Sequence, residues 1–117
     1  IFMPTFASFR DASAQMGTLL HEAAHATGAK HRLDRNFAER FKRDSLAIEE
    51  ICAELTASFV LADLGIAHHP RADHAAYVAS LRALKDDPRA IFTAASKAQA
   101  AADWMHAQQP QPEELAA

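Results

Sequence analysis

His21, Glu22 and His25 form an HExxH motif, the part of this sequence with the most specific chemistry. Side chains four residues apart on a helix lie one above the other, so His21 and His25 can offer two imidazoles to one metal ion. Glu22 lies one position round the helix, where it can reach a metal-activated water without being a ligand. The motif therefore predicts half of a zinc site and the general base that would use it.

The residues around the motif favour a cleft over an exposed helix face. The apolar stripe of this helix is expected to consist of Met16, Leu19, Leu20 and Ala23. The two histidines would then project from a different side, together with the small residues Ala14 and Thr18. A solvated face would more often carry Lys and Glu.

A zinc site needs a third protein ligand, and His31 is one candidate. It completes the longer pattern HExxHxxGxxH, in which Gly28 lets the chain turn so that a third histidine reaches the ion. That pattern alone would indicate a metzincin. However, the only later methionine, Met105, falls in an expected helix and not in a supporting turn.

Glu50 is the other candidate, on a helix that is hydrophobic nearly all round and is therefore expected between neighbouring helices. Glu50 and Glu54 are stacked four residues apart among apolar residues, where two carboxylates without cationic partners would be costly to bury. Glu50 would bind the metal, and Glu54 would accept the second ring N–H of a ligand histidine. We favour this arrangement. Structural salt bridges are the alternative, with the available cations being Arg32, Arg35 and Lys42.

Composition indicates one small helical domain. The chain has 117 residues, of which 50% are hydrophobic and only three are glycine, as expected for closely packed helices. A net charge of −3 gives no bulk attraction for nucleic acid or an anionic membrane, and no apolar run is long enough to span one. Cys52 is the only cysteine, which fits a reducing cytoplasm. We expect it to be a small buried packing residue. Because the chain opens at Ile1, we expect the natural protein to have residues upstream.

Four long helices are expected, over about 12–27, 45–64, 72–84 and 88–106, with a short helical turn around 37–41. The first helix is expected to be capped by Asp11 or Ser13 and the last by Asp87, and the second is expected to start near Asp44 and Ser45. Residues 1–9 are expected to be an extended β remnant, which Pro4 would confine to a sheet edge. The domain would comprise 1–107, and 108–117 would be a flexible tail.

His68 and His69 are expected in a surface turn, and Trp104 with Ile91 and Phe92 in the core of the last helix. One basic cluster is present, made of Arg32, Arg35, Arg40, Lys42 and Arg43. A nucleic-acid surface is possible at this cluster but weakly supported.

Taken in order, these motifs resemble the ArdC-type zincin-like metallopeptidase domain. The segments that carry the resemblance are 19–28, 31–35, 47–55, 62–66, 73–77, 85–92 and 101–104, so it covers nearly all of 3–106. In that family the domain forms the C-terminal part of plasmid antirestriction proteins and of TraC-like conjugative primases. The resemblance implies a mainly α (α+β) fold, a compact zincin-like domain of the minigluzincin kind with an HExxH-plus-Glu zinc site.

The resemblance also assigns further residues. Glu50 and Glu54 match the family's E-x-x-A-(D/N) pattern, and Ala29 stands where the family usually has a histidine, so His31 looks incidental. His74 and Tyr77 match D-H-x-A-Y, and either could donate to the oxyanion of the tetrahedral intermediate. The strands that normally precede residue 1 lie outside this sequence. ArdC relatives also carry a separate N-terminal domain that binds single-stranded DNA, which makes such DNA an expected partner through that domain.

The sequence therefore predicts a zinc metallopeptidase domain with Glu22 as general base and a protein or peptide as substrate. Its setting would be an ArdC-like antirestriction or conjugation-associated protein in the cytoplasm, with no membrane partner. The alternative is a non-catalytic, zinc-stabilised module of a mobile-element protein that contacts protein or DNA.

Overall fold

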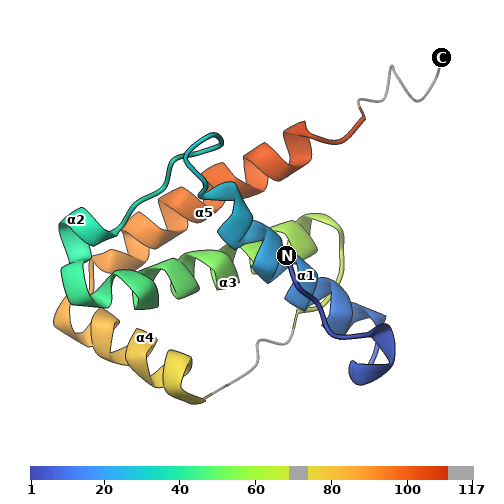
Figure 1. Cartoon of the computed structure of the whole chain (residues 1–117), viewed down its shortest axis with the longest axis horizontal. Coiled ribbons are helices and arrows are strands. Elements are labelled where there is room, and N and C mark those ends of the chain that lie inside the picture. The colour runs from blue at the N-terminus through green and yellow to red at the C-terminus, as the bar shows by residue number, and fades with distance from the viewer. Residues whose placement is uncertain (69–73, 111–117) are drawn as a thin grey trace.

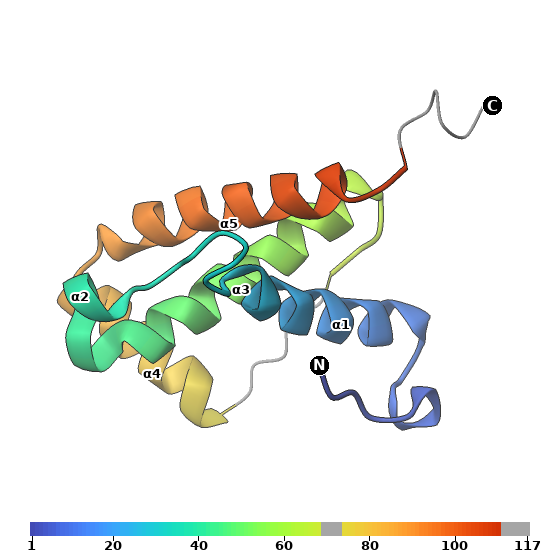
Figure 2. The same cartoon turned by 45° about the horizontal axis from the view of Figure 1, so that its top comes forward.

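Helix α3 (Ser45–Asp63) lies at the centre of the molecule, with the other long helices packed around it (Figure 1). The computed structural model describes residues 1–68 and 74–110, and the side chains of 74–77 are not included. The remaining helices are α1 (Ala12–Thr27), α2 (Ala38–Phe41), α4 (His74–Asp86) and α5 (Ala90–Ala107), with 3-10 turns at Phe6–Ser8 and Lys42–Asp44. Figure 2 shows α3 between α5 and α1.

The close packing of α3 against α5 depends on small side chains. α5 contributes a stripe of fully buried alanines, namely Ala90, Ala94, Ala98, Ala101 and Ala102. α3 contributes Ile48 and Cys52, both fully buried. The prediction that α3 lies between neighbouring helices is therefore confirmed. Cys52 is a packing residue, and burial raises the pKa of its thiol to about 11.

Helix α1 begins as predicted, because the Asp11 side chain accepts a hydrogen bond of 2.8 Å from the Ala14 N–H. The predicted apolar stripe of this helix is wrong: its four residues are only partly buried. The buried residues are instead Gly17, Ala24 and Thr27, at the spacing that also includes His21. Small residues let α1 approach α3 closely, and the histidines lie within this contact.

Helix α3 ends in a Schellman motif, as the position of Gly65 suggested. Gly65 has φ of +71°, its N–H bonds Ala62 O at 3.0 Å, and the Ile66 N–H bonds Leu61 O at 2.9 Å. This left-handed conformation favours glycine and redirects the chain sharply at the end of the helix.

The predicted β remnant is wrong for the described residues, which contain no strand. A strand requires a neighbouring strand for its hydrogen bonds, and the described helices offer none; Thr5 and Phe9 are extended but flank a 3-10 turn. Asp87 does not cap α5 either. Its N–H bonds Ala83 O at 3.0 Å and so continues α4, while α5 begins only at Ala90.

The turn around 37–41 is present as α2. The third long helix is present as α4, described from His74 onward, and its expected start near residue 72 lies outside the described residues. Residues 111–117 of the predicted tail lie outside them too. Phe92 is 74% exposed and is not a core residue, whereas Ile91 packs against the core and Trp104 is half-buried under the Arg32 guanidinium.

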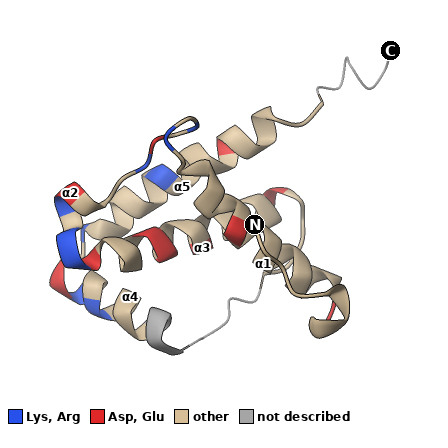
Figure 3. Ribbon diagram, viewed as in Figure 1, with Lys and Arg blue, Asp and Glu red and all other residues tan. Residues whose placement is uncertain are grey.

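The basic residues of 32–43 are divided along the ribbon between the loop after α1 and the turns around α2 (Figure 3). Arg35 is almost fully buried, Arg40 donates to Thr93 Oγ1 at 2.7 Å, and Arg43 lies 3.7 Å from an Asp86 oxygen. Of the helices within 1–68 and 74–110, none combines the length and apolar character needed to cross a bilayer.

Candidate metal centre

His21, His25 and Glu50 converge where α1 packs on α3, and together they form a group that could hold a metal ion. The two Nε2 atoms lie 3.2 Å apart. Each of them lies 3.0 Å from a different oxygen of Glu50. Two nitrogens bound to one tetrahedral zinc ion at 2.0–2.1 Å would lie about 3.3 Å apart, so the three side chains fit a single ion.

His31, the competing candidate, does not reach this group. It is exposed in the loop after α1, and the metal-binding group found among the described residues does not include it. Gly28 has φ of −75°, an ordinary helical value, so the chain does not make the special turn that the longer histidine pattern would need.

Glu54 and His68 extend the centre on the His21 side. His21 Nδ1 lies 2.9 Å from Glu54 Oε2, as the spacing of the glutamates predicted, and Glu54 Oε1 lies 2.7 Å from His68 Nε2. The expected exposed position of His68 is wrong, because its side chain is only 14% exposed, and His69 lies outside the described residues. A Cβ at Gly17 would lie 3.2 Å from His68 Nδ1. A glycine inside a helix was therefore the signal for this close approach.

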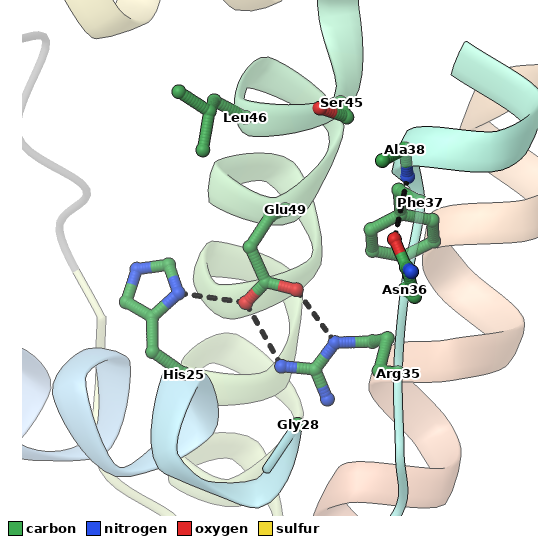
Figure 4. A pocket seen from close by; sticks show the side chains of 9 residues that line it. All are labelled: His25, Gly28, Arg35, Asn36, Phe37, Ala38, Ser45, Leu46 and Glu49. Atoms are coloured by element: carbon green, nitrogen blue, oxygen red, sulfur yellow. Dashed lines mark hydrogen bonds and ion pairs between the residues drawn. The ribbon is translucent and has the colours of Figure 1, made fainter. Parts of the chain in front are cut away.

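Glu49 and Arg35 extend the centre on the His25 side (Figure 4). His25 Nδ1 lies 2.7 Å from Glu49 Oε2. Arg35 donates to both oxygens of the same carboxylate, from Nε at 2.7 Å and from Nη2 at 2.9 Å. Sequence reasoning missed Glu49 and considered Arg35 only as a partner for the other two glutamates. Arg35 belongs to an irregular segment, which carries no periodic signal for this contact.

Hydrogen bonds across the centre shift the pKa values of its members. The bonds to Glu50 and Glu54 raise the pKa of His21 to about 10, and those to Glu49 and Glu50 raise the pKa of His25 to about 9. The same bonds hold the pKa of Glu50 far below its ordinary value. Burial opposes the shift at Glu49, but Arg35 and His25 together still lower its pKa.

Basic side chains and carboxylates alternate in the centre. His21, His25 and Arg35 face the carboxylates of Glu49, Glu50 and Glu54, and His68 also contacts Glu54. A divalent cation can therefore replace two protons on the imidazoles and leave the total charge unchanged.

Of the three predicted catalytic residues, only Glu22 has a described side chain. Glu22 is half-buried on α1 and makes no hydrogen bond or ion pair with any residue of 1–68 or 78–110. It differs in this respect from the three carboxylates of the centre. The side chains of His74 and Tyr77 lie outside the described residues, so their role as oxyanion donors stays a prediction.

A pocket of about 390 Å³ opens beside His25 and Glu49 (Figure 4). It lies between the end of α1, the chain before α2 and the first turns of α3, and the remaining lining residues are Gly28, Arg35, Asn36, Phe37, Ala38, Ser45 and Leu46. Phe37 is buried and Leu46 is 79% exposed, so the pocket has an apolar floor and one apolar side chain open to solvent. It offers space for a ligand next to the metal group.

Residues 1–97 match the sequence model of a family described as zincin-like metallopeptidase. Among curated relatives, the uncharacterized protein y4eC of Sinorhizobium fredii is 58% identical over 108 residues, covering 92% of this chain and 35% of that protein. A DNA primase TraC of Escherichia coli is 44% identical over 107 residues, covering 90% of this chain and 10% of the primase. The chain thus corresponds to a minor part of each longer relative.

Two solved structures share the fold. The metal-free crystal structure of the antirestriction protein ArdC from plasmid R388 has a TM-score of 0.73 at 45% identity, covering 89% of this chain and 38% of that one. Its Mn(II)-bound structure has a TM-score of 0.70 at 50% identity, covering 90% and 39%. A protein similar to this chain therefore binds a divalent cation.

Proposed function

This chain belongs to the zincin-like metallopeptidase family, and we propose that it hydrolyses peptide bonds with a zinc ion held by His21, His25 and Glu50. The observation that carries the proposal is the convergence of two imidazole Nε2 atoms on both oxygens of one carboxylate. A second observation supports it: Glu22, beside the first ligand, has no partner among the described residues and is free to act as a base.

The chemistry follows from these residues. When bound, a zinc ion supplies Lewis-acid chemistry, making water acidic enough to lose a proton near neutral pH and polarising the substrate carbonyl. Glu22 accepts the proton of the attacking water and later delivers it to the leaving nitrogen, so one water is added across one C–N bond. Glu54 holds His21 through Nδ1 and keeps its Nε2 directed at the metal group.

His74 and Tyr77 are proposed as donors to the oxyanion that forms during attack on the carbonyl. The pocket beside His25 is the proposed location of a substrate side chain, because it opens next to the reacting groups. The identity of the ion is part of the proposal as well: two nitrogens and one carboxylate suit zinc, and the related ArdC has been crystallised with Mn(II).

The biological setting is proposed from the named relatives. Proteins similar to this chain are called antirestriction ArdC and DNA primase TraC, and the chain spans 38% and 10% of their lengths. We place the domain in an antirestriction or conjugation-associated protein, with single-stranded DNA as a partner of another domain.

The test is Glu22→Gln, which keeps the three ligands and removes the base. We expect zinc-loaded protein to cleave peptides in a complex peptide mixture, read by mass spectrometry of new termini, and the variant to lose about 10²- to 10⁴-fold in rate. Zinc affinity should stay unchanged, which shows that only the base was removed. Equal cleavage by the variant would refute a catalytic role for Glu22.

A non-catalytic zinc module is the second candidate. It is favoured by one observation: the described residues contain no strand, whereas an extended substrate is often held by pairing with a strand edge. If zinc-loaded wild type cleaves nothing while Glu22→Gln retains every cellular function of the natural protein, this second function is the correct one.

A further inference from the structure

We propose that Arg35 is a positioning residue of the metal centre: its guanidinium fixes the Glu49 carboxylate, which in turn orients the His25 imidazole for metal binding. The proposal concerns metal binding itself and is independent of whether the domain hydrolyses peptides.

The Arg35 guanidinium is buried and fully paired. Its side chain is 2% exposed, and a buried cation is tolerated only where its donors are paired. Nε and Nη2 bind Glu49, Nη2 also bonds Ala24 O at 2.9 Å, and Nη1 bonds Thr27 Oγ1 at 3.0 Å. All three nitrogens are used, so the guanidinium is held in one orientation between the last turns of α1 and the first turns of α3.

One oxygen of Glu49 binds both Arg35 and His25. Oε2 receives Arg35 Nη2 at 2.9 Å and His25 Nδ1 at 2.7 Å. An imidazole whose Nδ1–H donates to a carboxylate presents the Nε2 lone pair to a metal and binds it more strongly. His25 Nε2 is in that position, 3.2 Å from His21 Nε2. A rotation of the Glu49 carboxylate would therefore move one metal ligand relative to the others.

Gly28 packs closely against the Arg35 guanidinium. A Cβ added there would lie 2.9 Å from Arg35 Nη2 and 3.1 Å from Cζ. The backbone angles of Gly28 are helical and suit any residue, so space, and not a turn, explains the glycine. The chain thus leaves room for the guanidinium in this position.

The two sides of the centre differ in how their carboxylates are held. Glu54, on the His21 side, is held by the imidazole of His68 through a single oxygen, Oε1. Glu49, on the His25 side, is held by a guanidinium, which is always charged and binds both oxygens in a planar fork. Loss of Arg35 would leave Glu49 free to rotate, and Glu49 would have no permanent countercharge.

The experiment compares Arg35→Met with Arg43→Met in the full chain. Arg43 is the matched control, because its side chain is 84% exposed and it lies away from the centre. Zinc affinity is measured by competition with a chromogenic chelator, and ligand geometry by the visible absorption of the Co(II)-loaded protein. We expect Arg35→Met to bind zinc about 10- to 100-fold more weakly with an altered Co(II) spectrum, and Arg43→Met to match wild type.

Two further variants make the result decisive. Arg35→Lys keeps the charge but loses the planar fork, so it should recover only part of the affinity. Arg35→Met that is folded by circular dichroism and binds zinc with wild-type affinity and spectrum overturns the proposal. If Arg35→Met does not fold, Glu49→Gln decides, since it removes the charge that Arg35 fixes: weaker binding supports the proposal, and unchanged binding overturns it.

Discussion

At the scale of single residues, the two nitrogens of each imidazole in the centre have different roles. Both Nε2 atoms face Glu50, whereas the Nδ1 atoms face Glu54 and Glu49. Each ring is therefore held on one side and free to bind a metal on the other.

The choice of Glu50 over His31 as third ligand can be tested directly. We expect Glu50→Ala to lose at least 100-fold in zinc affinity, because a group that bridges both Nε2 atoms is removed. His31→Ala should bind zinc like wild type, since His31 is exposed outside the group. Chelator competition on both variants measures this, and the opposite pattern would establish a three-histidine site.

Metal binding is expected to release close to two protons at pH 7.5. The raised pKa values of about 10 for His21 and about 9 for His25 mean that both rings are protonated before the metal binds. Calorimetric titration with zinc in buffers of different ionisation enthalpy measures the number released. A count near zero in wild type would contradict the charge exchange.

Sequence alone could identify the metal group and Glu54, which holds His21, but not the other residues that hold the ligands in place. His21 and His25 are marked by helical spacing, and Glu50 by its place, four residues before Glu54, on a helix rich in apolar residues. Arg35 and His68 come from irregular segments, and their contacts depend on how three pieces of chain meet. Such contacts leave no periodic pattern in the sequence.

At the scale of elements, the end of α3 carries a specific prediction. Gly65→Ala places a Cβ at φ of +71°, where no atom is within 4 Å, so the expected cost is backbone strain alone, about 1 kcal/mol in the free energy of unfolding. Gly65→Asn is the matched control and should cost less, because Asn tolerates this conformation. Urea unfolding followed by circular dichroism measures both. Equal stability of Gly65→Ala and wild type would contradict the motif.

The long helices were predictable because hydrophobic patterns, caps and Gly65 mark them along the chain. The face that α1 buries was not, because it depends on the partner helix: α1 meets α3 through its small residues and its histidines, and Leu19 and Leu20 remain partly exposed. The start of α5 was missed by two residues because Asp87 completes α4 instead.

At the scale of the whole molecule, the metal centre joins α1 to α3, so metal binding should stabilise the domain. Zinc at 100 times its dissociation constant adds about 2.7 kcal/mol, which raises the Tm by about 10 °C in a domain of this size. Thermal melts with zinc and with a chelator measure this, and Glu50→Ala should show little difference between the two. An unchanged wild-type Tm would mean that the ion does not bind the folded state preferentially.

Without metal, stability should depend on pH in a defined direction. The pKa values of His21 and His25 are raised above the ordinary 6.5, so their contribution is fully present below that pH and is lost as pH rises through 9 to 10. Melts of chelator-treated protein between pH 6 and 10 should show a falling Tm. A Tm that rises over this range would contradict the protonated ion pairs.

The enclosure of Cys52 has a practical consequence. It is the only thiol of the chain, it is fully buried, and its thiolate form is disfavoured at neutral pH. Maleimide dyes and spin labels should therefore leave the native domain unmarked. A cysteine introduced at the solvent-facing Phe92 would then carry a single reporter, with no need to engineer away the original sulfhydryl.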